Sequence, residues 1–171
     1  MSLTLNFRTA ITAAETLEGA PDSAAASKRV VTHDQFDTAL TLNAASTPAV
    51  SRCSNAKIAL AAGAATIDLT AMQGIGAAAA SVVNATGLKL QLMKFKNLGA
   101  NPMTIVPGAA NGYQWGNSAT DQITVAPKVG TIPGEVTVFC NGAAPTVAGG
   151  AKTIDIAGTL VQEFEIQLYF G

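Results

Sequence analysis

The sequence predicts an all-β protein: an antiparallel, jelly-roll-like β-sandwich with an N-terminal arm and at most one short helix. The first observation is a hydrophobic period of two that recurs in short segments and is typical of strands with one buried face. The second is the punctuation of these segments by glycine, proline and asparagine, about every 8 to 12 residues in the C-terminal half. Many short strands spaced in this way favour a sandwich or barrel.

The N-terminal segment predicts an arm that pairs with a neighbour. Its apolar residues alternate with polar ones: Leu3, Leu5 and Phe7 fall on one face, and Thr4, Asn6 and Arg8 on the other. Residues 13–28 are rich in alanine, serine and glutamate, with a turn signal at Pro21, which indicates a loop or a short helical turn. The expected division is therefore an arm over residues 1–28 and a sandwich domain over residues 29–171.

The middle of the chain resumes strand character. Strands are expected over residues 29–43, around residues 57–60 and over residues 66–70. Residues 71–85 are ambiguous, because alanine favours a helix whereas two glycines and two valines weaken one. One short helix or a long loop is expected there.

The C-terminal half predicts regularly spaced strands. The first begins with Leu88, Leu90 and Leu92 on one face, and the last places Phe164 and Ile166 on a buried face. The expected strands span residues 88–97, 103–106, 113–115, 122–125, 135–140, 153–156 and 162–170.

Signals for catalysis, cofactors and metals are weak, and the sequence predicts a non-enzymatic protein without a catalytic, cofactor or metal site. The segment that starts at Gly74 fits G-x-G-x-x-A, but no acidic residue lies between Asp68 and Asp121 to bind a ribose. His33 is the only histidine, and no nucleophile elbow accompanies it. The carboxylates are dispersed, and the two cysteines have no metal-binding spacing and are expected as free thiols.

Two groups of residues invite a binding interpretation. Lys94 and Lys96 share one face of a strand, either as solvated lysines that protect a sheet edge or as contacts to an acidic neighbour. Tyr113 and Trp115, among several amide side chains, could stack on a sugar ring; alternatively they pack in the core or at a subunit interface. With the arm, the candidate interface residues are Leu3, Leu5, Phe7, Arg8, Lys94, Lys96, Tyr113 and Trp115.

Composition restricts the partners. Charged residues make up only 12% of the chain, against about 25% in an average domain, which indicates a subunit with little free surface. A net charge of −1 gives no electrostatic case for nucleic acid or an anionic membrane. No apolar run reaches the length of a membrane span, and a secretory signal is not expected at the N-terminus.

The strand and turn motifs of the last hundred residues resemble those of a known class. The motifs are Ile-Asp-Leu-Thr-Ala from Ile67, Gly-Leu-Lys-Leu-Gln-Leu-Met-Lys-Phe-Lys-Asn from Gly87, Met-Thr-Ile-Val-Pro-Gly from Met103, Ile-Thr-Val-Ala-Pro from Ile123 and Ala-Lys-Thr-Ile-Asp-Ile-Ala-Gly from Ala151. They resemble small β-sandwich structural proteins of tailed bacteriophages, in the neighbourhood of head decoration or cement proteins.

The resemblance implies a virion protein that bridges and stabilises capsid subunits. The implied partners are the major capsid protein and further copies of the chain, as a homotrimer, with synthesis in the bacterial cytoplasm before incorporation into the virion. The alternative function is a receptor- or glycan-binding module of the tail or fibre, which would need Tyr113, Trp115 and Asn117 exposed together.

Overall fold

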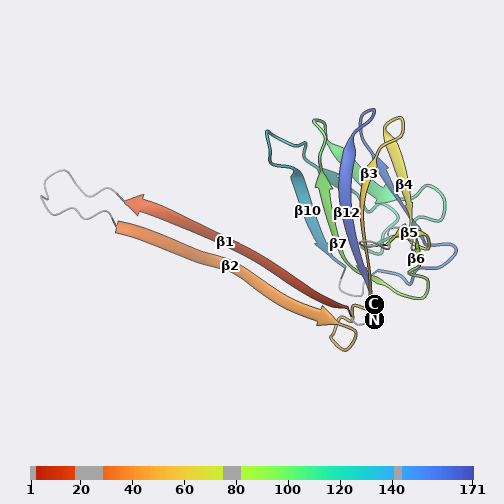
Figure 1. Ribbon diagram of the computed structural model, residues 1–171, viewed down its shortest axis with the longest axis horizontal. Helices are drawn as coiled ribbons and strands as arrows, with labels where there is room; N and C mark the ends of the chain where they lie inside the picture. The colour runs from red at the N-terminus through yellow and green to blue at the C-terminus, as the bar shows by residue number, and fades with distance from the viewer. Residues whose placement is uncertain (1–2, 18–28, 75–81, 141–143) are drawn as a thin grey trace, which may run out of the picture.

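The computed structural model describes residues 3–17, 29–74, 82–140 and 144–171, and it confirms the all-β antiparallel prediction (Figure 1). Two packed four-stranded sheets form a sandwich, and a long two-stranded hairpin projects from one end of it. The described residues contain no helix.

Each sheet is antiparallel throughout. The first sheet has the order β10 (Gly134–Phe139), β7 (Leu90–Asn97), β12 (Glu163–Phe170) and β3 (Arg52–Ala59). The second has the order β4 (Ala64–Asp68), β11 (Thr153–Ala157), β8 (Met103–Pro107) and β9 (Ile123–Val125). The arm consists of β1 (Thr4–Leu17) and β2 (Arg29–Asn43), and a small sheet pairs β5 (Met72–Gln73) with β6 (Val82–Val83).

The core lies between the two sheets and follows the register of the strands. In the first sheet, Ile166 of β12 lies opposite Phe95 of β7 on one side and Ala56 of β3 on the other, and all three are buried. The rings of Phe95 and Phe164 stack with centroids 5.0 Å apart. The expected alternation of β12 is confirmed, because its even-numbered residues from Phe164 to Phe170 are all buried.

Strand β7 departs from the expected alternation. The register between β12 and β7 shifts so that Tyr169 pairs with Leu92 and Phe170 with Leu90, which skips Gln91. This bulge moves Leu92 to the opposite face from Leu90, because one extra residue reverses the faces of a strand. The single leucine face expected from the sequence is therefore wrong, and Met93 belongs to the core.

Several expected boundaries also change. Strand β1 runs to Leu17, past the loop expected from residue 13, and residues 18–28 lie outside the described residues. Strand β2 pairs only with β1, so the arm extends to Asn43 instead of ending at residue 28. The expected strand at residues 113–115 is wrong, because these residues lie in the β8–β9 loop.

In the ambiguous stretch 71–85, the described residues form β5 and β6 and no helix; residues 75–81 lie outside the described part.

Replacing Phe164 with alanine should destabilise the sandwich strongly, because its fully buried ring stacks on Phe95 and its removal leaves a cavity in the core. A loss of about 3–5 kcal/mol in the free energy of unfolding is expected from the removal of a buried phenylalanine. Chemical denaturation measures it. Val161→Ala, at a side chain that is 78% exposed, is the control and should change stability by less than about 0.5 kcal/mol. Equal effects of the two substitutions would contradict this core.

Candidate functional site

The candidate functional site is the arm, which extends away from the sandwich (Figure 1). Its strands pair from Thr4 opposite Asn43 to Leu17 opposite Arg29, with one register shift after Ile11. At about 3.3 Å per residue, the 14 residues of β1 span about 46 Å, against about 26 Å for the eight residues of β12. A lone two-stranded ribbon is marginally stable in water, so an arm of this length gains stability when a neighbour packs on it.

The base of the arm is held by a second apolar cluster outside the sandwich core. Leu42, Val50 and Leu92 are 5%, 0% and 2% exposed, yet none of them belongs to the main core cluster. Leu92 lies opposite Phe139 in the first sheet, and the ring of Phe139 meets that of Phe7 edge-on at 4.8 Å. We call these five residues the root cluster. The Phe7–Phe139 contact packs the start of β1 against the outer face of β10, and the Val50 amide donates a hydrogen bond to the Asn43 carbonyl at the end of β2 at 2.8 Å.

The alternation expected at the start of the arm is confirmed. Leu3, Leu5 and Phe7 are half-buried, whereas the residues between them and Arg8 are exposed. The structure thus assigns Phe7 a contact within its own chain, and a contact of these residues with a partner stays a prediction. Sequence reasoning did not find Leu42, Val50, Leu92 and Phe139, because only the β7 bulge and the position of the arm bring them together.

Lys94 and Lys96 lie on the outer face of the first sheet, on an inner strand. Strand β7 is flanked by β10 and β12, so the interpretation as edge-protecting lysines is wrong. The ammonium group of Lys94 lies 2.8 Å from a carboxylate oxygen of Glu135, and that of Lys96 lies 3.9 Å from Glu135 and from Glu165. The acidic neighbours of these lysines therefore come from adjacent strands of the same chain.

This row of charges continues to the edge of the sheet. Glu135, Lys96, Glu165 and Lys57 lie opposite one another across the four strands, with alternating signs. The Lys57 ammonium group also lies 2.7 Å from a carboxylate oxygen of Glu163. The hydrogen bond to Glu163 and the negative charge of Glu163 raise the pKa of the Lys57 ammonium group. Opposite charges in cross-strand positions favour this register, although each exposed pair contributes little free energy.

Tyr113 and Trp115 are in the core, with 0% and 4% of their surface exposed. The Tyr113 hydroxyl accepts a hydrogen bond from the Leu90 amide at 2.9 Å and donates one to the Pro145 carbonyl at 2.7 Å. Burial raises the pKa of Tyr113 to about 12. The exposed aromatic platform needed for sugar stacking is thus absent at these two residues, and neither reaches the surface to meet a partner.

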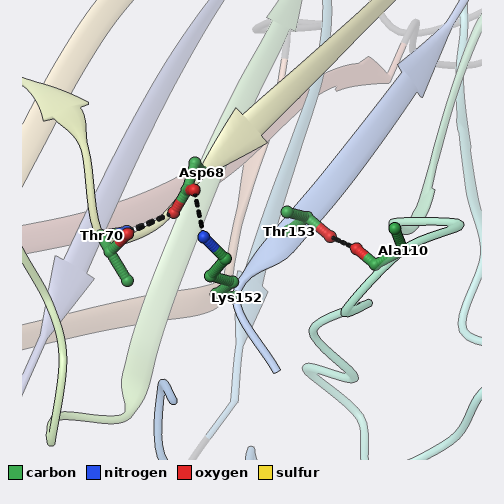
Figure 2. A network of polar contacts seen from close by, with 5 residues as sticks. All are labelled: Asp68, Thr70, Ala110, Lys152 and Thr153. Atoms are coloured by element: carbon green, nitrogen blue, oxygen red, sulfur yellow. Dashed lines mark hydrogen bonds and ion pairs between the residues drawn. The ribbon is translucent and has the colours of Figure 1, made fainter. Parts of the chain in front are cut away.

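A polar network joins the ends of β4 and β11 (Figure 2). One carboxylate oxygen of Asp68 accepts a hydrogen bond from the Lys152 ammonium group at 2.7 Å, and the other accepts one from the Thr70 hydroxyl at 2.6 Å. Thr153 donates a hydrogen bond to the Ala110 carbonyl and so joins β11 to the β8–β9 loop. These contacts hold the end of the second sheet together.

The described residues do not bring metal-ligating side chains together into a site. None of its His, Cys, Asp and Glu side chains forms a group of three or more that could hold a metal ion. His33 lies in β2 opposite Ala13, and Cys53 and Cys140 are free thiols. Among the residues described, no helix has the length and hydropathy to cross a membrane.

Comparisons with protein-family models, curated proteins and solved structures found no match to this chain.

Replacing Phe7 with alanine should loosen the arm while the sandwich stays folded. Phe7 contacts Phe139 of the sandwich, and among the described residues this is the aromatic contact that joins the arm to the sandwich. An aromatic pair contributes about 0.5–1.5 kcal/mol beyond its buried area. Hydrogen exchange should therefore become about tenfold faster at residues 39–43 and stay unchanged in β12. Thr4→Ala, at an exposed neighbour, is the matched control. Faster exchange throughout the sandwich would contradict a separate root cluster.

Replacing Asp68 with asparagine should make unfolding less dependent on pH. Desolvation raises the pKa of Asp68, but hydrogen bonds from Lys152 and Thr70 and the charge of Lys152 outweigh it and leave the pKa below 3.8. A depressed pKa stabilises the fold above pH 3.8, and this contribution disappears as the pH falls through the folded-state pKa. Because the pair is partly exposed, the loss at pH 7 should stay below about 1 kcal/mol. Urea denaturation at pH 7 and pH 2.5 measures it; an equal loss at both would exclude a charged Asp68.

Proposed function

We propose that this chain is a non-enzymatic structural protein of a tailed-phage virion, a decoration or cement protein that bridges capsid subunits. The arm carries this proposal. Its strands, of 14 and 15 residues, extend from a sandwich whose own strands have eight residues or fewer. Such an arm adds little to its own fold and offers two long strand edges to a neighbouring subunit, a common mode of β-strand recognition.

The strand order of the sandwich also supports the proposal. With its eight strands numbered along the chain, the two sheets have the orders 6-3-8-1 and 2-7-4-5. This order fits an eight-stranded jelly roll, the architecture of many viral capsid domains. The same architecture serves lectins and cupins, so it favours a class of scaffold and the arm provides the argument for function.

The proposed mechanism is avidity. Each arm makes backbone hydrogen bonds and apolar contacts with an adjacent subunit of the major capsid protein, and the symmetry of the shell multiplies these contacts. The pairing of Lys94 and Lys96 with carboxylates of the same chain fits this mechanism, because few charges remain to be desolvated on assembly. The alternative function, glycan binding, has less support, because Tyr113 and Trp115 are buried in the core and cannot stack on a sugar ring.

Shortening the arm should remove the protein from virions. Thr9 and Thr38 lie opposite each other, so replacing residues 10–37 with an Asn-Gly turn keeps the base of the arm and its register. Quantitative mass spectrometry of purified particles should find the intact chain at a fixed copy number and the shortened variant at least about tenfold lower, since the arm supplies the repeated contacts.

The unfolding midpoint of the sandwich is the control for this variant and should not change. Absence of the intact chain from particles, or unchanged occupancy after shortening, would contradict the proposal.

A further inference from the structure

The end of the sandwich opposite the arm is built from four loops, which we call the distal end (Figure 1). They are residues 60–63, 98–102, 126–133 and 158–162, and each connects a strand of one sheet to a strand of the other. Their position follows from the antiparallel order, because every second connection lies at the same end.

Hydrogen bonds join these loops into one unit. The Gly63 amide donates to the Leu160 carbonyl at 3.0 Å, and the Lys128 amide donates to the Gly99 carbonyl at 2.8 Å. Gln162, only 7% exposed, donates from its side chain to the Asn101 carbonyl at 3.0 Å. The distal end is thus preorganised, and little conformational entropy remains to be lost when it binds.

The distal end exposes aliphatic side chains. Val129, Ile132, Leu160 and Val161 are 73–78% exposed, and they are four of the six large hydrophobic residues found exposed in the described part. Leu160 adopts a φ of 51°, a left-handed conformation that is unfavourable for a leucine. Several exposed aliphatic side chains on one end of a domain mark a candidate interaction site.

A projecting tip and a hollow lie beside each other on this end. Val129 and Ile132 form the tip, because they pair across a tight turn through two backbone hydrogen bonds. The hollow, of about 570 Å³, lies between residues 98–101 and 159–163. Lys128 is the only charged residue in the four loops. Glu163, which pairs with Lys57, also lines the hollow. The tip beside Lys128 and the hollow lined by Glu163 therefore meet in two copies without like-charge repulsion.

We propose that the distal end binds a second copy of this chain, with a two-fold axis between the copies. The Val129–Ile132 tip of each copy enters the hollow of the other, as a self-complementary interface requires. The arms of such a dimer leave from opposite ends. Its use to join two capsid subunits rests on the proposed function, whereas the dimer itself does not. A dimer differs from the homotrimer that the sequence resemblance implies.

Sedimentation velocity of the full chain over a wide concentration range tests the dimer. The wild type should show a concentration-dependent monomer–dimer equilibrium, and V129S/I132S should raise the dissociation constant at least tenfold. Val82→Ser, at an exposed valine away from the distal end, is the control and should leave the constant unchanged. A monomer at all concentrations, a trimer, or association insensitive to V129S/I132S would overturn the proposal.

Cross-linking tests the arrangement of tip and hollow. Mixing an Ile132→Cys chain with an Ala100→Cys chain should give a disulfide-linked heterodimer on mild oxidation, well above the yield of the wild type with its native thiols.

A third measurement addresses a lipid occupant: flotation with phosphatidylglycerol vesicles. Wild-type binding that V129S/I132S abolishes would assign the distal end to a membrane and overturn the dimer; no binding agrees with it. Because none of these measurements involves virions, the dimer and the proposed function can fail separately.

Discussion

The packing of β7 on both faces is the constraint on which the rest of the structure depends. Its inner face places Met93 and Phe95 in the sandwich core, and its outer face places Leu92 in the root cluster. The bulge at Gln91 makes this possible, because it turns Leu92 outward while Leu90 stays buried. Leu92 thereby lies opposite Phe139 of β10, whose ring contacts Phe7 of the arm, and this contact gives the two-stranded ribbon a base on the sandwich.

On the outer face of the same sheet, apolar contacts and charged contacts lie in different places. Leu92 and Phe139 lie opposite each other near the arm, and the cross-strand row from Glu135 to Lys57 lies farther from it. Because each charge in this row has an oppositely charged neighbour, the face is electrically balanced and presents no net field to attract a charged partner. This face therefore offers no excess charge for a charged partner.

Most strands and turns of the fold could be predicted from the sequence, because the signals for strands and turns are local. The alternation of β12, the turns around Gly108 and Gly130 and the pattern from Leu3 to Phe7 each predict structure from adjacent residues. The bulge in β7 could not be predicted, since it depends on the register with β12. The burial of Trp115 was likewise open, because one sequence fits both a surface platform and a loop that closes the core.

The two proposed interaction surfaces differ in what they can contribute. The arm provides length and unpaired strand edges, so its contacts form only when a partner strand or groove orders them. The distal end provides a rigid surface on which only four aliphatic residues are exposed, a small part of the roughly 20–30 residues that a stable interface buries on each partner. In the proposed assembly, one contact is weak and the other forms only with a partner. A subunit that binds in the wrong place can therefore dissociate before assembly is complete. Occupancy of both ends at once then raises the effective concentration at each contact and stabilises the assembled state.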